Sequence, residues 1–192
     1  MTSIRAFIAI ELPLEIHSQL ENVVKRLKAA RAVSVRWVAS GNIHLTLKFL
    51  GDTEPANLNP LSVLLSEVAS RYNPMTLVIN GLGAFPNNKR PRVIWIGVEI
   101  PTQMKDLHWD IEGAAERIGC PPEGRDFSPH LTLGRVQKNA TRENTENISA
   151  ALAAITVGEL GRFQSTGFTL FRSDLRPSGS IYTPLEYFQF TQ

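Results

Sequence analysis

Polar and apolar residues alternate in two short stretches of the chain that begin with the same four letters. His44-Leu45-Thr46-Leu47 recurs as His130-Leu131-Thr132-Leu133, 86 residues further along a chain of 192 residues. Such alternation predicts a half-buried β-strand, because successive side chains on a strand point to opposite faces. Each copy is therefore expected to present a histidine and a threonine on one face and leucines on the other.

The remaining pattern predicts alternating strands and amphipathic helices. Apolar residues with helical spacing predict helices over residues 14–30, 57–71, 102–118 and 142–154. Apolar or alternating runs predict strands over residues 5–12, 43–50, 75–80 (continuing towards Phe85), 93–100, 127–136, 160–171 and 180–190. Stretches rich in Pro, Gly, Asn and Ser predict loops, notably over residues 86–92, 119–126 and 173–179.

The order of these elements indicates an internal duplication. Residues 9–13 (Ala-Ile-Glu-Leu-Pro) are matched by residues 97–101 (Gly-Val-Glu-Ile-Pro), at nearly the offset of the two histidine motifs. We therefore expect one domain over residues 1–192, with repeats of approximately 5–92 and 93–190. The expected fold is α+β and bilobal with pseudo-two-fold symmetry. Mainly antiparallel sheets would line a central cleft, with helices on the outer faces.

Composition places the chain among ordinary globular proteins. Hydrophobic residues make up 43% and charged residues 20%, and the net charge of +2 permits an anionic ligand without requiring one. Cys120 is the single cysteine, so an intrachain disulfide is excluded and a reducing compartment is favoured. No apolar run approaches the length of about 18 residues that a membrane span needs. We expect a cytoplasmic protein with no membrane association.

Two histidines in one cleft suit general acid–base catalysis. The imidazole pKa is about 6.5, so neutral and protonated forms are both available near neutral pH. A threonine two residues further along the same face can donate a hydrogen bond to a phosphoryl oxygen. A lone strand histidine is usually structural, but recurrence at the same place in both halves favours a shared catalytic role.

Metal binding is the competing use of histidine. Zinc sites take three or four protein ligands, and the chain has only four histidines and one cysteine. His17 and His108 lie on predicted helices, share no motif with the other two, and are interpreted as solvated or capping residues. We therefore expect no metal site.

These motifs resemble those of the 2H phosphoesterases, a superfamily named for two His-x-Thr/Ser-x motifs. The opening RAFIAIELP and the runs HLTLKFLG, RPRVIWIGV and SPHLTLGRV are similar to its bacterial and archaeal RNA 2′,3′-cyclic phosphodiesterase branch. Members of that branch were first called 2′-5′ RNA ligases. The resemblance implies a monomeric hydrolase that converts RNA 2′,3′-cyclic phosphate ends to 2′-phosphate ends without a metal or other cofactor. We also expect cleavage of 2′-5′ linkages and, as the reverse of that cleavage, weak joining of RNA ends.

The resemblance also implies roles for five residues. His44 would protonate the departing 3′ oxygen, His130 would accept a proton from water, and Thr46 and Thr132 would bind phosphate oxygens. Arg135, five residues after His130, would bind the phosphate. A near-symmetric cleft does not assign the acid and the base from sequence.

Arg135 poses a geometric problem. Strict alternation from His130 puts residue 135 on the opposite face of the strand. Either a bulge at Gly134 re-aims the strand, or the strand ends there and Arg135 is a surface residue.

Further contacts with RNA are expected from weaker signals. Lys48 shares the predicted face of His44, and Arg92 belongs to a basic loop with Lys89 and Arg90. Phe7, Trp37 and Phe49 are candidate base-stacking residues, each with an alternative role in the hydrophobic core.

Two other functions remain compatible with the sequence. The first is a 2H enzyme that acts on a small cyclic-phosphate metabolite. The second is a non-catalytic RNA-binding module that uses the same cleft.

Overall fold

The computed structural model describes residues 3–177 and 179–191, in which four α-helices accompany a single nine-stranded sheet. The helices are α1 (Leu14–Ala29), α2 (Pro55–Ala69), α3 (Thr102–Glu116) and α4 (Arg142–Ala154). The strands are β1 (Ile4–Ile10), β2 (Val35–Trp37), β3 (Leu45–Thr53), β4 (Met75–Phe85), β5 (Val93–Glu99), β6 (His130–Val136), β7 (Glu159–Ser165), β8 (Gly167–Arg176) and β9 (Gly179–Gln189).

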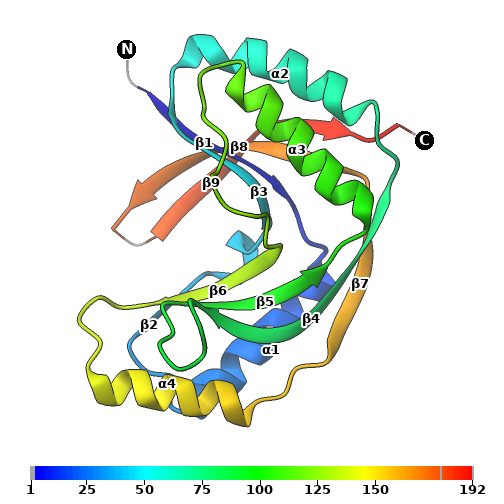
Figure 1. Cartoon of the computed structure of the whole chain (residues 1–192). Helices are drawn as coiled ribbons and strands as arrows, with labels where there is room; N and C mark the ends of the chain where they lie inside the picture. The colour runs from blue at the N-terminus through cyan, green and yellow to red at the C-terminus, as the bar shows by residue number, and fades with distance from the viewer. Residues whose placement is uncertain (1–2, 178, 192) are drawn as a thin grey trace.

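Eight strands follow one another across the sheet in the order β7-β4-β5-β6-β3-β1-β8-β9, and β2 pairs with β6. Every pairing is antiparallel. The sheet curls into a half-barrel whose concave side is open (Figure 1). Helices α2 and α3 cover its outer side at one end, and α1 and α4 cover it at the other (Figure 1). The predicted α+β class and its antiparallel pairing are confirmed.

The strand order is symmetric about the central pair, β3 and β6. β5 and β1 flank the central pair, β4 and β8 come next, and β7 and β9 form the two edges. β4, from the first half of the chain, pairs with β5, whereas β8, from the second half, pairs with β1. Each end of the sheet therefore contains strands from both halves. The duplication itself stays a prediction, but it would explain this order.

Two predicted segments differ from the structure. The strand expected over residues 160–171 is two strands, β7 and β8, separated at Thr166, and they lie far apart in the sheet. The loop expected over residues 173–179 is mostly β-structure, because β8 continues to Arg176 and pairs with the start of β9. Ser178, which the expected loop included, lies outside the described residues.

The hydrophobic core lies between the sheet's outer face and the helices. One continuous cluster of buried residues joins both ends of the molecule and includes Ile8, Leu45, Ile94 and Leu131. A small second cluster of Phe7, Ala9 and Phe171, with Tyr182 packed on it, lies apart from that core. Because Phe7 and Ala9 alternate with buried Ile8 along β1, this second cluster marks the concave face. No helix in the described part of the chain is long and apolar enough to span a bilayer.

Candidate active site

Both motif histidines are held by the same local contact. Nδ1 of His44 lies 2.9 Å from the carbonyl oxygen of Asn42, and Nδ1 of His130 lies 2.7 Å from that of Ser128. A carbonyl only accepts, so each Nδ1 carries the proton and donates it. This leaves Nε2 of each ring available for proton transfer. His44 was predicted within a strand over residues 43–50, but a short 3-10 helix at Ser40–Asn42 precedes it and β3 begins at Leu45.

The register of the two central strands brings the motifs together. Leu45 of β3 pairs with Leu131 of β6. In an antiparallel pair this register sets His44 opposite Thr132 and Thr46 opposite His130. The paired leucines are 1% and 0% exposed, in the core, so their neighbours along each strand face the concave side.

Aromatic rings surround both imidazoles. Phe7 stacks on His44 with ring centroids 4.8 Å apart, and Tyr182 meets the same ring edge-on at 5.3 Å. Phe85 meets His130 edge-on at 4.9 Å. Phe7 itself is 3% exposed, so the expectation that it stacks on an RNA base is wrong. Its ring packs against the imidazole of His44 instead.

Burial shifts both histidines towards the neutral form. It lowers the pKa of His44 to about 4, although the hydrogen bond to Asn42 acts in the opposite direction. Burial also lowers the pKa of His130, and the positive charges of Arg125 and Arg135 add to this effect. A negatively charged ligand beside the rings would favour the imidazolium and raise both pKa values.

A β-bulge in β6 resolves the orientation of Arg135. Val93 and Trp95 of β5 share one face; Val93 pairs with Arg135 and Trp95 with Thr132, so Leu133 is the extra residue of the bulge. The shift restores Arg135 to the face of Thr132. Gly134 fits here because an added Cβ would lie 2.7 Å from Val35 Cγ1. The side chain of Arg135 is exposed.

A matching bulge in β3 moves Lys48 away from the cleft. Ile8 of β1 pairs with Lys48, and Ala9 pairs with Thr46, so Leu47 is the extra residue. Lys48 therefore points to the core side, is 1% exposed, and cannot line the cleft as predicted. Its ammonium donates to the Glu112 carboxylate at 2.6 Å and to the Pro121 carbonyl at 2.7 Å.

The same bulge turns Phe49 towards the concave face. Phe49 pairs with Phe7, which belongs to the concave cluster, and its own side chain is 51% exposed. Phe49 occupies in β3 the place that Arg135 occupies in β6, two residues beyond the bulged leucine. Of the two roles expected for Phe49, core or base stacking, the exposed ring excludes the core.

The basic residues are arranged differently from the expectation. Arg92 is exposed in the loop before β5, and its backbone carbonyl accepts from Val136 N at 2.9 Å; no contact joins its side chain to the histidines. Arg36 of β2, which the sequence reading missed, is exposed and lies directly opposite Arg135. The signal in the sequence was an arginine between two apolar residues, Val35 and Trp37.

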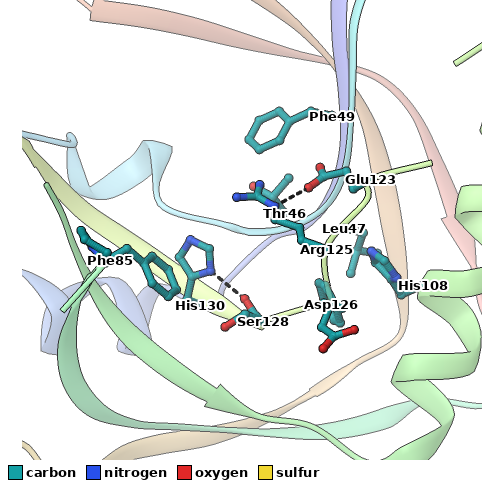
Figure 2. Close-up of a pocket in the computed structure, with 12 residues that line it drawn as sticks. Thr46, Leu47, Phe49, Phe85, His108, Glu123, Arg125, Asp126, Ser128 and His130 are labelled. Carbon is teal, nitrogen blue, oxygen red and sulfur yellow. Dashed lines mark hydrogen bonds and ion pairs between the residues drawn. The ribbon is translucent and has the colours of Figure 1, made fainter. Parts of the chain in front are cut away.

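A pocket of about 380 Å³ adjoins this site on the concave side. Thr46 and Phe49 line one side, Phe85 and His130 another, and the loop over residues 123–128 closes it (Figure 2). Arg125 donates to Glu123 within this loop at 2.9 Å. His108, expected to be solvated or capping, is 7% exposed and stacks on Phe127 with ring centroids 4.1 Å apart, and both side chains line the pocket. Among the described residues, no cluster of three or more histidine, cysteine, aspartate or glutamate side chains is arranged to hold a metal.

Comparison with known proteins agrees with the paired motifs. The family model described as LigT-like phosphoesterase matches the chain twice, over residues 10–95 and 96–182. The chain belongs to the LigT-like phosphoesterase family. Each match contains one histidine–threonine pair.

Relatives within the LigT-like family align over nearly the whole chain. The RNA 2′,3′-cyclic phosphodiesterase of Methanothermobacter thermautotrophicus is 34% identical over 186 residues, covering 97% of this chain and 98% of that protein. The Escherichia coli protein of the same name is 32% identical, covering 98% and 97%. The crystal structure of E. coli LigT complexed with 3′-AMP superposes with a TM-score of 0.76 at 31% identity, covering 99% of both chains.

Proposed function

We propose that this protein hydrolyses RNA 2′,3′-cyclic phosphate ends to 2′-phosphate ends by two-histidine acid–base catalysis. One observation carries the proposal: the Leu45–Leu131 register sets two His–Thr pairs side by side on the concave face, each with a free Nε2. The names of the full-length relatives and the 3′-AMP complex of E. coli LigT support a nucleotide substrate.

In the proposed reaction a water molecule attacks phosphorus in line with the bond to the 3′ oxygen. His130 Nε2 accepts the proton of the attacking water. The bond from phosphorus to the 3′ oxygen breaks, and protonated His44 donates its Nε2 proton to that oxygen. Each transfer contributes typically about 10²–10⁴-fold to the rate. The assignment of His44 as acid and His130 as base rests on the family resemblance.

The threonines and Arg135 complete the proposed site. Thr46 lies opposite His130 and Thr132 opposite His44, so a phosphate between the rings meets one hydroxyl from each strand. Arg135, on the face of Thr132, offers guanidinium donors to the remaining oxygen. With both proton transfers supplied by histidine, the proposed reaction requires no metal.

The same groups also serve the joining of RNA ends. If the 5′-hydroxyl of another RNA replaces water, His130 accepts its proton, His44 protonates the departing 3′ oxygen, and a 2′-5′ linkage forms; cleavage of that linkage is the reverse, with the roles of acid and base exchanged. In water the equilibrium favours hydrolysis, so we expect joining to be weak. We further expect a monomer that acts on RNA in the cytoplasm, which light scattering and cell fractionation would test.

The test uses an RNA oligomer that ends in a 2′,3′-cyclic phosphate. Wild type, His44→Ala and His130→Ala are incubated with it in excess EDTA, and the product end is identified. We expect wild type alone to make a 2′-phosphate. A 3′-phosphate product would contradict the assignment of the leaving oxygen, and loss of activity in EDTA would contradict metal independence. Binding without turnover would favour the RNA-binding module, and strong preference for a mononucleotide would favour the metabolite enzyme.

A further inference from the structure

Three contacts hold the ring of His44 without using Nε2. Nδ1 donates to the backbone carbonyl of Asn42 at 2.9 Å. The ring of Phe7 stacks on one face, with centroids 4.8 Å apart and 25° between the planes. Tyr182 meets the imidazole edge-on, with centroids 5.3 Å apart and 79° between the planes. Phe7 lies on a strand with a partner on each side, but Tyr182 lies on the edge strand β9.

Tyr182 belongs to a hairpin that extends beyond its neighbouring strand. β8 and β9 pair over the whole of β8, whereas β1 pairs with β8 only from Thr169 to Arg172. Tyr182 pairs with Ser173, just beyond the last of these residues. In the part of the chain that the structure describes, the end of β8 and the start of β9 thus pair only with each other and project from the sheet (Figure 1). Two strands alone are marginally stable, so the position of Tyr182 needs a further attachment.

The side chain of Asn42 supplies this attachment. Its Nδ2 donates to the backbone carbonyl of Ser180 at 2.8 Å, across 138 residues of sequence. Ser180 lies on β9, two residues before Tyr182. Asn42 is the last residue of the 3-10 helix that precedes His44. One residue therefore contacts His44 through its backbone and the hairpin through its side chain.

A small cavity of about 160 Å³ lies where these groups meet. Asn42, His44 and Tyr182 line it, together with the titratable residues Glu11 and His17. If the hairpin moved away, more water would reach the imidazole. Because burial lowers the pKa of His44 to about 4, this exposure would raise the pKa towards its ordinary value of about 6.5. The pKa of His44 therefore reports whether the hairpin is in place.

We propose that Asn42 is a positioning residue for the reaction, whose side chain holds the β8–β9 hairpin so that Tyr182 packs against His44 and fixes the direction of Nε2. The inference rests on the proposed function, because it assumes that His44 transfers a proton. Removing the side chain should reduce kcat and leave KM nearly unchanged, since the groups proposed to bind the phosphate stay in place.

A titration of His44 by NMR tests the attachment without turnover. It compares wild type, Asn42→Ala, Asn42→Ser and the control Asn57→Ala. Serine keeps a polar side chain in the turn but is too short to reach the hairpin, so it replaces alanine if that variant does not fold. Asn57 of α2 makes a similar bond, from Nδ2 to the carbonyl of Ile118 at 3.3 Å, and lines neither cavity. The pKa of His44 should rise in both Asn42 variants and stay at the wild-type value in Asn57→Ala.

Hydrolysis of an RNA 2′,3′-cyclic phosphate end tests the effect on the reaction. The maximum of kcat over the pH profile is compared, so that an altered pKa does not enter the comparison. Asn42→Ala should reduce this maximum about 10–100-fold, the effect of a misplaced catalytic group, and change KM by less than about twofold. Tyr182→Leu should have a similar effect. Because both changes act through the same ring, the double variant should lose no more than the weaker single variant.

The two measurements separate this inference from the proposed function. An unchanged pKa of His44 and an unchanged kcat in Asn42→Ala would overturn the positioning role. Losses of Asn42→Ala and Tyr182→Leu that multiply in the double variant, or an equal loss in Asn57→Ala, would also overturn it. A raised pKa of His44 in Asn42→Ala, with no turnover by wild type, would overturn the proposed function and leave the attachment of the hairpin standing.

Discussion

The ammonium of Lys48 lies 2.6 Å from the carboxylate of Glu112, and both side chains are almost fully buried, at 1% and 4% exposure. This pair joins β3, which carries Thr46 and Phe49, to α3 and to the loop that ends at His130. Two charges removed from water are tolerated only because each is matched by the other and by backbone groups. The pair therefore couples the two walls of the site.

Removing one member of this pair should destabilise the protein strongly. Lys48→Met leaves the Glu112 carboxylate buried without its cation, which typically costs about 3–5 kcal/mol. Urea unfolding of the variant measures the change in the free energy of unfolding. The matched control is Arg142→Ala, which breaks a surface pair with side chains 93% and 62% exposed and should change stability by less than about 1 kcal/mol. A decrease for Lys48→Met no larger than that of the control would contradict the structural role of the buried pair.

The two bulges explain which parts of the site could be predicted from the sequence. The helices and most strands were predicted because their periodicity is local, and the His–Thr pairs were predicted because the motif recurs. Alternation fails after Leu47 and Leu133, where one extra residue reverses the face of everything beyond it. Strict alternation therefore places Lys48 in the cleft and leaves the side of Phe49 open between base stacking and the core, whereas the structure has Lys48 in the core and the ring of Phe49 exposed. Gly134 gave a local signal for one bulge, but nothing in the residues around Leu47 signals the other.

The pairing of β8 with β1 could also not be predicted from local sequence patterns. These two strands come from opposite ends of the chain, whereas β4 and β5 are consecutive strands. Arg36 was missed for the same reason. Only the pairing of β2 with β6 shows that Arg36 lies beside Arg135.

The lowered pKa values of the histidines predict an acidic optimum for kcat/KM. This parameter reports the free enzyme, in which burial lowers the pKa of His44 to about 4 and that of His130 below its usual value. The reactive form needs one ring protonated and one neutral. Above both pKa values that form declines about tenfold per pH unit, so kcat/KM should already fall between pH 6 and pH 7. The optimum of kcat should lie at higher pH than that of kcat/KM, because the bound phosphate raises the pKa of both histidines. An optimum of kcat/KM above pH 7 would rule out this account.

The same burial predicts that His44 destabilises the fold in acid. The folded protein holds His44 neutral down to about pH 4, whereas the unfolded chain binds a proton below about 6.5. The unfolded state therefore binds more protons in this window, and stability falls as pH is lowered through it. At pH 5 the contribution of His44 is up to about 2 kcal/mol relative to pH 8.

His44→Gln isolates this contribution, because glutamine does not titrate. Urea unfolding of both proteins at pH 8 and pH 5 gives the two differences in free energy. Wild type should lose more stability than the variant over this interval, while His108 and His130, whose pKa values are also lowered, contribute equally to both. Equal decreases would show that His44 titrates normally in the folded protein.

Replacement of Arg36 should have opposite effects on stability and on RNA binding. The two like charges lie directly opposite on neighbouring strands, which is unfavourable in the free protein unless an anion lies between them. Arg36→Ala should therefore raise the free energy of unfolding by about 0.2–1 kcal/mol. It should also weaken binding of an RNA oligomer and reduce the slope of log K against log salt by about 0.7 for each phosphate that the variant no longer neutralises.

Arg135→Ala should weaken binding of a mononucleotide as well, because its proposed partner is the reacting phosphate. The exposed Arg142 of α4 supplies the control, since Arg142→Ala should leave the salt slope unchanged. If Arg36→Ala and Arg142→Ala bind RNA alike, Arg36 does not contact the RNA backbone.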